Sequence, residues 1–273
     1  MNISYEKTQI KKVAICFWGL TRSLKYTLHS IEKNIFEPLI KNNIPYDIFI
    51  HTYTTNKIYS NPRAEEKNLI LDNDEYKLLK PKYYKIENQE YIKKKINVDK
   101  YKTMGNPWVE SESFSNHLLA LWSLNEVTAL WTPRAKYYTN VIYCRPDLEY
   151  LCPIDIRWLY GSDDVIYTPN FHRKPTLFTK KGSKMSINDR FAIGKPLTMK
   201  YYGNRFLEAL EYSKTHQLES RIFLEDTLRK HNVKIIFINF VFIRVRATGK
   251  RRAGNVRRTK KIIRSKNVCK MTQ

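Results

Sequence analysis

The residues best suited to chemistry come directly after an apolar run that is typical of a buried strand. Residues 140–144 are NVIYC, and the chain continues with RPDLE at 145–149. Side chains at alternate positions of an extended chain share a face, so we expect Arg145, Asp147 and Glu149 to point the same way. Two carboxylates on one face can hold Mg²⁺ or Mn²⁺, which take one or two protein carboxylates and fill their shell with water and phosphate oxygens. The alternative is a surface turn in which Arg145 pairs with one of the carboxylates.

A sheet must position these charged residues, and the start of the chain predicts one. Residues 11–18, KKVAICFW, form a continuous apolar run that is typical of a strand covered on both faces. Residues 24–40 place apolar side chains at helical spacing, and residues 46–53, YDIFIHTY, predict a second buried strand. A strand, a helix and a strand in this order favour a parallel sheet. Open parallel sheets bind ligands outside the carboxyl ends of their strands, which is where residues 145–149 follow theirs.

The rest of the chain continues the alternation of strands and helices. The clearest helix is at 113–130. Further strands are predicted at 139–145, 164–167 and 188–194, helices at 200–212 and 219–231, and a final strand or pair of strands at 233–245. The sequence therefore predicts one α/β domain, residues 1–245, with a mostly parallel sheet flanked by helices. A basic C-terminal tail, residues 246–273, follows it.

Composition and cysteine usage limit the class of protein. Hydrophobic residues make up 42% of the 273 residues, which is enough to bury a full core and excludes a disordered chain. No apolar run reaches the roughly 18 residues of a membrane span, and the polar start of the chain predicts no secretory signal. The cysteines, Cys16, Cys144, Cys152 and Cys269, lack the spacing of a zinc site or a disulfide framework. We expect Cys16 and Cys144 to be buried free thiols and the protein to be cytoplasmic.

Positive charge is concentrated towards the end of the chain. The net charge is +23, and the 47 residues after Asp226 contain 15 basic and no acidic side chains. Such a tail could bind nucleic acid, or an anionic membrane surface where each Lys or Arg contributes about 1 kcal/mol. The chain has no recognised nucleic-acid motif, which argues against nucleic acid. A basic protein that binds nucleic acid or anionic membranes, without enzymatic activity, is the alternative to an enzyme.

Four segments in a fixed order carry a resemblance to a known family. They are VAICFWGLTRS, YDIFIHTY, NVIYCRPDLEY and INDRFAIGKP, which begin at Val13, Tyr46, Asn140 and Ile187. The set resembles small GT-A glycosyltransferases encoded by large algal viruses and bacteria, whose members carry an R-x-D-L signature in place of a strict D-x-D. In size and style it is most similar to the chlorovirus enzymes that build capsid-protein glycans. The resemblance covers residues 10–245 and leaves out the basic tail.

The resemblance implies a metal-dependent glycosyltransferase with a GT-A-like, Rossmann-like sheet. Such an enzyme would move a sugar from a nucleotide-sugar donor onto a glycan or glycoprotein acceptor, such as a viral capsid-protein glycan. A UDP-linked donor is favoured, xylose is one candidate sugar, and inversion is favoured over retention. If the source is viral, the compartment would be the cytoplasm of the infected host cell. Two further alternatives are a nucleotidyl- or phosphotransferase that uses the same metal and an inactive protein that only binds sugar.

The resemblance also implies that the nucleotide lies against the loop after the first strand. Gly19 would let the backbone approach the ligand closely, Thr21 lies in the same loop, and Arg22 could reach a phosphate. Thr52, at the end of the second strand, could contact uracil or ribose. The alternatives are an ordinary strand-to-helix turn with a surface arginine and, at Thr52, a plain strand end.

At residues 145–149 the resemblance implies a metal ion and a diphosphate. Asp147 would be the principal ligand of Mn²⁺ or Mg²⁺, and Glu149 would support it directly or through water. Arg145 would orient Asp147 or bind phosphate. Because this arginine stands where a strict motif has its first carboxylate, it weakens the expectation of metal dependence. Arg244 and Arg246, at the end of the last predicted strand, could close over the diphosphate.

An inverting transfer also needs a general base near the acceptor hydroxyl. Asp189, in the segment NDRFAIG, is the first candidate, and Glu219, at the start of a predicted helix, is the second. Each has a structural alternative. Asp189 could form a salt bridge with Arg190, and Glu219 could stabilise the start of its helix through the helix dipole.

Overall fold

The computed structural model describes residues 10–55, 58–61, 65–102, 112–170 and 187–251. These residues form a central seven-stranded sheet in the order β10-β8-β9-β6-β1-β2-β5. The strands are β1 (Val13–Trp18), β2 (Tyr46–Thr54), β5 (Tyr83–Asn88), β6 (Asn140–Cys144), β8 (Val165–Pro169), β9 (Phe191–Gly194) and β10 (Lys234–Ile238). Within this sheet β9 is antiparallel to β6 and β8, and the other strands are parallel to one another. The predicted α/β domain with a mostly parallel sheet flanked by helices is confirmed.

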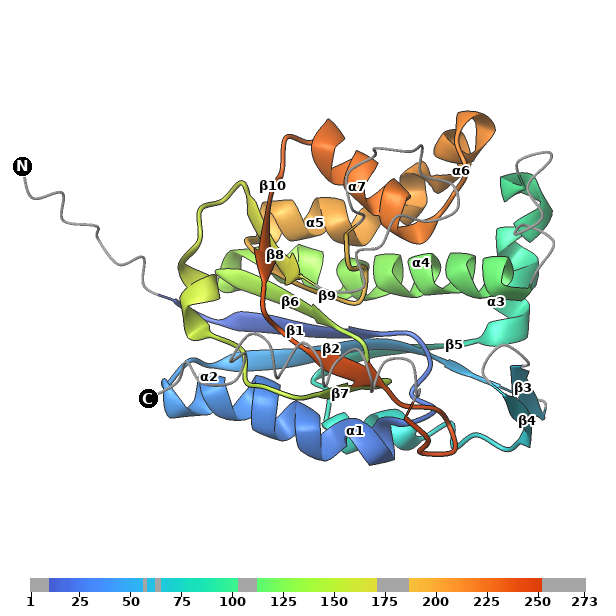
Figure 1. The fold of residues 1–273 in the computed structure, drawn as a ribbon, viewed down its shortest axis with the longest axis horizontal. Helices are drawn as coiled ribbons and strands as arrows, with labels where there is room; N and C mark the ends of the chain where they lie inside the picture. Colours follow the sequence, from blue (N-terminus) through green and yellow to red (C-terminus); the bar gives the residue numbers. More distant parts are fainter. Residues whose placement is uncertain (1–9, 56–57, 62–64, 103–111, 171–186, 252–273) are drawn as a thin grey trace, which may run out of the picture.

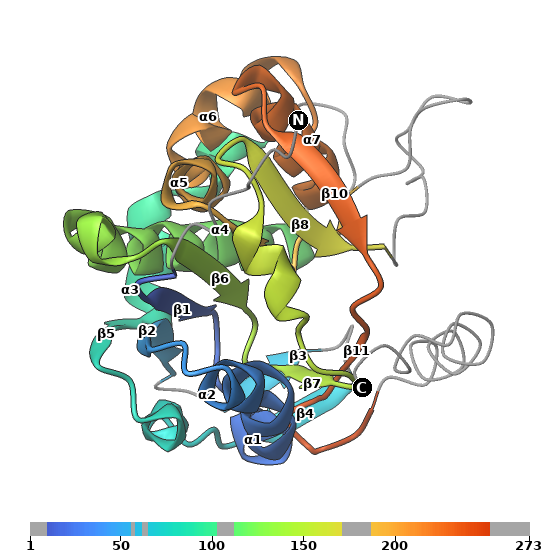
Figure 2. The same ribbon diagram turned by 90° about the vertical axis from the view of Figure 1, so that its left-hand side faces the viewer.

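Helices cover both faces of the sheet, as Figures 1 and 2 show. The helices are α1 (Leu24–Ile31), α2 (Glu37–Lys41), α3 (Gln89–Ile96), α4 (Glu112–Trp131), α5 (Pro196–Asn204), α6 (Phe206–Thr215) and α7 (Ser220–Lys230). Side chains of β1 alternate between the two faces: its odd-numbered residues pack with α1 and α2, and its even-numbered residues pack with α4, α5 and α7. Every residue of β1 is therefore buried, which explains its continuous apolar sequence. Cys16 and Cys144 are buried free thiols in β1 and β6, as predicted.

The chain turns sharply where β6 ends. Pro146 and Asp147 form a turn, and β7 (Leu148–Tyr150) then leaves the main sheet to pair with β11 (Phe242–Arg244) in antiparallel register. The chain does not stay extended through residues 145–149, because a proline cannot donate to the ladder of a central strand. The predicted final strand at 233–245 is thus two strands, β10 in the main sheet and β11 beside β7.

Shorter elements complete the fold. A π-helical turn (Glu32–Phe36) joins α1 to α2, β3 (Tyr59–Asn61) pairs with β4 (Glu66–Leu69), and 3₁₀ helices lie at Glu75–Leu79, Val98–Tyr101, Thr132–Tyr137 and Ile156–Tyr160. The helix predicted at 200–212 is two helices, α5 and α6, which meet at Arg205. Across the ranges that the structure describes, no helix combines the length and apolar character needed to cross a membrane.

Candidate functional site

The order of the strands reverses next to β1. From β1 the chain proceeds to β2 and β5 on one side, and it later crosses to β6 on the other side. Open parallel sheets bind ligands outside the carboxyl ends of the strands at such a switch point. Phe17 of β1 pairs with Cys144 of β6, so the residues that follow them, Trp18 and Arg145, lie side by side where the two strands end. Two segments selected from the sequence, 19–22 and 145–149, therefore lie at the same edge of the sheet.

The loop after β1 leaves open space in front of its backbone. Gly19 has a φ of +94°, in the region that favours glycine. Its N–H donates to Ser123 Oγ at 2.8 Å, which holds the loop against α4. Among the described residues, a Cβ added to Gly19 would meet no heavy atom within 4 Å. A ligand could therefore come close to the backbone at this point.

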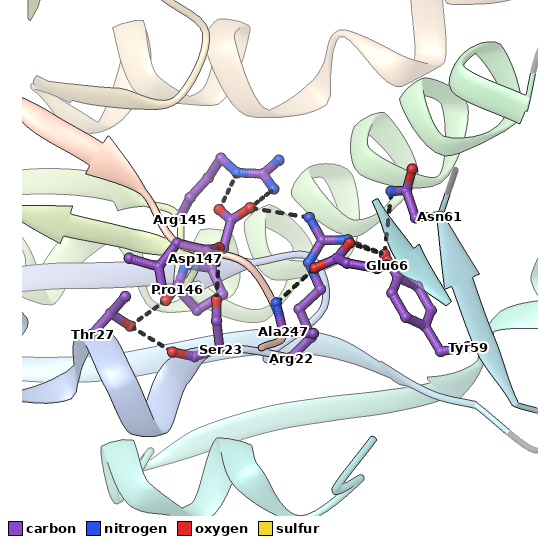
Figure 3. A network of polar contacts seen from close by, with 11 residues as sticks. Arg22, Ser23, Thr27, Tyr59, Asn61, Glu66, Arg145, Pro146, Asp147 and Ala247 are labelled. Carbon is purple, nitrogen blue, oxygen red and sulfur yellow. Dashed lines mark hydrogen bonds and ion pairs between the residues drawn. The ribbon is translucent and has the colours of Figure 1, made fainter. Parts of the chain in front are cut away.

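Arg145 and Asp147 form a bidentate ion pair at the turn after β6 (Figure 3). Nε and Nη2 of Arg145 donate to the two oxygens of Asp147 at 2.7 Å each, and the Asp147 side chain is 1% exposed. The Arg145 guanidinium also lies over the Trp18 ring, 4.9 Å from its centroid. Burial raises the pKa of Asp147, but the charge and hydrogen bonds of Arg145 outweigh burial and hold that pKa well below its usual range. Asp147 is thus ionised at neutral pH, and both of its oxygens accept from a guanidinium group.

Buried hydrogen bonds fix this turn from two other segments. Thr27 Oγ1, on α1, donates to the carbonyl of Pro146 at 2.6 Å. The N–H of Val245, just after β11, donates to the carbonyl of Asp147 at 3.0 Å. Ser23 Oγ in turn donates to the carbonyl of Val245 at 3.2 Å. The position of Asp147 is therefore set by α1 and β11 as well as by its own strand.

Arg22 joins the same network from the loop after β1 (Figure 3). Its Nη2 lies 3.6 Å from Asp147 Oδ2, and its Nη1 lies 3.4 Å from Glu66 Oε2 and contacts the hydroxyl of Tyr59. Glu66 is itself buried and accepts from the N–H of Ala247 at 2.6 Å. The Arg22 side chain is only 10% exposed, so this residue is part of a buried network and is not a surface arginine.

Two further arginines interact with Asp147, one from just before β9 and one from the end of β11. The antiparallel register of β9 on β6 brings Arg190 opposite Arg145, and Arg244 is the last residue of β11. The pKa of Arg244 is lowered first by the like charge of Arg190 and then by burial, and burial also lowers the pKa of Arg190. Within the described part of the chain, Arg244 Nε is buried without a hydrogen-bond partner. The arginine cluster, which we define as Arg22, Arg145, Arg190 and Arg244, thus surrounds Asp147 electrostatically.

Asp189, the first candidate for the general base, lies just before β9. Its Oδ1 is 3.9 Å from Arg190 Nε, so the predicted ion pair is present, and its side chain is 18% exposed. Within the ranges that the structure describes, Oδ1 is buried without a hydrogen-bond partner. Burial raises the pKa of Asp189, but the charge of Arg190 and a hydrogen bond from Ser220 outweigh burial and hold the pKa well below its usual range. Arg145 interacts electrostatically with Asp189 as well as with Asp147, which places the candidate base beside the cluster.

Three other residues that were predicted for the donor site are buried. Thr52 is fully buried in β2, and its Oγ1 has no hydrogen-bond partner among the described residues. Thr21 is also buried, and its carbonyl accepts from the N–H of Leu24 at the start of α1, at 3.0 Å. Arg246 is buried, and its N–H donates to the carbonyl of Lys250 at 2.9 Å. Their roles towards a nucleotide stay predictions.

The two remaining carboxylates are held by groups close to them. Glu149 accepts from Arg251 Nε and Nη2 at 2.5 and 2.6 Å. Glu219 precedes α7 and accepts from the N–H groups of Arg221 and Ile222 at 2.9 and 3.0 Å, which is a helix cap. These contacts agree with the alternative in which Glu219 stabilises the start of its helix. The roles of Glu149 as a metal ligand and of Glu219 as a base stay predictions.

A second polar network, beneath the Gly19 loop, was not predicted from the sequence. His51 Nδ1 lies 2.7 Å from Ser123 Oγ, and His51 Nε2 lies 3.0 Å from Glu87 Oε2. Serine, histidine and glutamate in this order suggest a nucleophilic triad. However, Ser123 is fully buried and its Oγ accepts from the N–H of Gly19, so the network positions the loop. No local pattern could have revealed it, because the residues come from β2, α4 and β5.

The carboxylates at the turn do not fit the predicted metal ion. Mn²⁺ or Mg²⁺ would need oxygens of Asp147 and Glu149, and both carboxylates already accept two hydrogen bonds from an arginine. In the part of the chain that the structure describes, no group of three or more His, Cys, Asp or Glu side chains could hold a metal ion. The surrounding guanidinium groups would also repel a divalent cation. The metal site stays a prediction, and no step below depends on a metal.

Sequence comparisons with known proteins give no match, and structural comparison gives a distant likeness. No family model matches the chain, and no curated protein matches it. A crystal structure of the galactosyltransferase LgtC in complex with donor and acceptor sugar analogues is similar over 83% of this chain and 73% of that chain. The sequence identity is 10% and the TM-score is 0.43. A likeness at this level carries no argument, so the function must follow from the site itself.

Proposed function

We propose that this chain is a glycosyltransferase that binds a nucleotide-sugar donor at the carboxyl ends of β1 and β6. The observation that carries the proposal is the arginine cluster around Asp147 at the switch point of the sheet. Guanidinium groups bind phosphate through paired, charge-assisted hydrogen bonds. A diphosphate offers several acceptor oxygens within a short span, so it suits several arginines at one edge. The sugar linked to that diphosphate is the group available for transfer.

The nucleoside of the donor would lie along the loop after β1. The open space in front of Gly19 would let the nucleoside approach the backbone there. A contact of Thr52 with the base or the ribose, which the resemblance implies, would need its fully buried side chain to become accessible. A UDP-linked donor, with xylose as a candidate sugar, rests on the resemblance of the four sequence segments. A glycan acceptor of the viral capsid-protein kind rests on the same resemblance.

Asp189 is the proposed general base of an inverting transfer. The oxygen of the acceptor hydroxyl attacks the anomeric carbon, and the bond from that carbon to the diphosphate oxygen breaks. The hydroxyl proton passes to the Asp189 carboxylate, and the nucleoside diphosphate leaves with the bonding electron pair. The low pKa of Asp189 keeps its carboxylate ionised before the reaction, and it also makes this carboxylate a weaker proton acceptor than an unpaired aspartate. Glu219 is the less favoured base, because its carboxylate caps α7.

A donor screen on the purified full-length protein tests the proposal. UDP-, GDP- and dTDP-sugars would be added with Mn²⁺ or with EDTA, and the melting temperature and the released products would be measured. We expect one nucleotide class to raise the melting temperature and its sugar to be slowly hydrolysed to free sugar and nucleoside diphosphate. Release of nucleoside monophosphate and sugar phosphate would instead indicate a nucleotidyl- or phosphotransferase. If no nucleotide sugar binds, the proposal is wrong.

An Asp189→Asn variant separates catalysis from binding. We expect it to bind the same nucleotide at least as tightly, because Arg190 loses a counter-charge, but to lose most of its turnover, because the base would be absent. Loss of binding in this variant would place Asp189 in the donor site and not beside the acceptor hydroxyl.

The division into a transferase domain, residues 1–245, and a basic tail, residues 246–273, stays a proposal, and so does binding of the tail to anionic membranes. Contacts in the described residues join the start of this segment to the body, among them Ala247 with Glu66, and Arg251 with Glu149 and Val245. Residues 252–273 lie outside the described ranges. Sedimentation with anionic and with neutral vesicles would test the membrane proposal, which requires binding to the anionic vesicles only.

A further inference from the structure

We propose that the arginine cluster takes the place of a divalent cation at the donor diphosphate, so that the protein binds its donor and releases nucleoside diphosphate without a metal ion. This inference rests on the proposed function, because it concerns the same site. It departs from the metal-dependent enzyme that the sequence predicts.

The first support is that Asp147 is built into an ion pair. A cation would have to displace two charge-assisted hydrogen bonds of 2.7 Å from Arg145. Arg145 cannot easily yield, because its guanidinium stacks on Trp18 and its backbone lies in a turn that α1 and β11 hold. Arg22 adds a second guanidinium 3.6 Å from the same carboxylate. The principal predicted metal ligand therefore serves to hold arginines in place.

The second support is the balance of charge. The arginine cluster contributes four guanidinium groups, and the carboxylates that pair with them in the described residues are Asp147, Asp189 and Glu66. Within the described ranges, at least one positive charge of the cluster is thus left without a paired carboxylate. A divalent cation would add to this excess, whereas a diphosphate would offset it.

The excess of positive charge is clearest at Arg244. The like charge of Arg190 is the largest cause that lowers its pKa, which means that the two guanidinium groups repel each other. Among the described residues, its Nε is buried and has no acceptor. A buried guanidinium nitrogen without an acceptor is costly, and an oxygen of a bound diphosphate would remove this cost. Arg244 and Arg190 are therefore the residues most suited to hold the diphosphate.

The same groups can stabilise the leaving group. As the bond between the anomeric carbon and the diphosphate oxygen breaks, the electron pair stays on that oxygen and its negative charge grows. Guanidinium groups that are already fixed in place can stabilise this charge without reorganising. The proton of the acceptor hydroxyl passes to Asp189, as above, so the reaction needs no further reactant.

Binding in the absence of metal tests the inference. The full-length protein would be titrated in a calorimeter with UDP, GDP, dTDP and inorganic diphosphate, first with EDTA and then with Mn²⁺. We expect inorganic diphosphate and at least one nucleotide to bind with EDTA present. We expect Mn²⁺ to change their Kd by less than about threefold, which is a small fraction of the binding free energy.

Arg244→Gln and a matched control then assign this binding to the cluster. In EDTA, Arg244→Gln should weaken diphosphate binding about tenfold or more, the effect of one charge-assisted hydrogen bond. Its melting temperature should not fall, because the change removes a repelled charge, and Arg244→Lys should restore part of the affinity. The control is Arg157→Gln. Arg157 pairs with an aspartate two residues away, as Arg145 of the cluster does, but it is 69% exposed and lies in a 3₁₀ helix that contacts the start of β6. This control should leave binding unchanged.

The outcomes separate this inference from the proposed function. Binding that requires Mn²⁺ would overturn the metal-free site and leave the transferase proposal intact. Equal binding by wild type and Arg244→Gln in EDTA would show that the cluster does not hold the diphosphate, and the inference would fail. If neither diphosphate nor any nucleotide binds under any condition, the proposed function itself is wrong.

Discussion

The pair of Arg145 with Asp147 and the pair of Arg157 with Asp155 have the same chemistry at opposite edges of the sheet. Each joins an arginine to an aspartate two residues away through more than one hydrogen bond. Asp147 is 1% exposed and Arg145 is 19% exposed, whereas Asp155 is 21% exposed and Arg157 is 69% exposed. The first pair also stacks on an aromatic ring and has three more arginines around it, while the second serves the cap of a 3₁₀ helix. A separation of two residues lets an arginine and an aspartate form an ion pair in both places. Only burial among other arginines makes one of the two pairs a candidate site.

The largest expected effect is on stability, at the buried pair. Asp147→Asn removes the counter-charge of Arg145, which stays partly buried among other guanidinium groups. We expect the free energy of unfolding to fall by about 3 kcal/mol, the usual result of breaking a buried ion pair from one side. Urea denaturation followed by circular dichroism measures this loss. A loss no larger than that of Asp155→Asn would show that the two pairs are equivalent.

The same buried pair should also make the stability of the protein depend on pH. The pKa of Asp147 in the folded protein lies well below its value in the unfolded chain, about 3.9. Its stabilising effect is therefore fully present above the unfolded pKa and is lost as the pH falls through the folded pKa. We expect the free energy of unfolding of the wild type to fall as the pH drops below about 5, and to fall less steeply in Asp147→Asn. Parallel curves for the two proteins would contradict the low pKa of Asp147.

A smaller effect is expected at the loop beside the buried pair. Gly19→Ala places a side chain at a φ of +94°, which should cost about 1 kcal/mol of stability. The added methyl group would occupy the open space in front of the loop, so nucleotide binding should weaken by more than the loss of stability explains. Melting temperature and calorimetric titration with the preferred nucleotide, measured on the same preparation, separate the two effects. Unchanged nucleotide affinity would place the ligand elsewhere.

The smallest effect is expected at the exposed pair. Asp155→Asn removes a carboxylate whose partner, Arg157, faces solvent. Exposed ion pairs contribute little because solvent screens them. We expect the urea midpoint and the nucleotide affinity to match those of the wild type within error. A clear loss of affinity would extend the site beyond the carboxyl edge of β1 and β6.

Local patterns in the sequence were enough for the main elements and for one part of the candidate site. The apolar runs predicted β1 and β2, and the RPDLE segment predicted the pairing of Arg145 with Asp147 as one of its alternatives. The extended course of that segment was not borne out, because Pro146 ends the strand and starts a turn. Arg190 was considered only as a partner of Asp189, since nothing near it in the sequence indicates that it lies opposite Arg145.

By itself, the sequence determined which segments become strands and helices, because burial on one or both faces imposes a local period on the apolar residues. It also indicated the ion pair at the turn as one alternative, because Arg145 and Asp147 are two residues apart. Only the tertiary structure decided that Arg22, Arg190 and Arg244 surround Asp147. These residues come from the loop after β1, the residue just before β9 and the end of β11, and strand order and register bring them together. Strand pairing over such separations depends on the packing of the whole core, which no local pattern records.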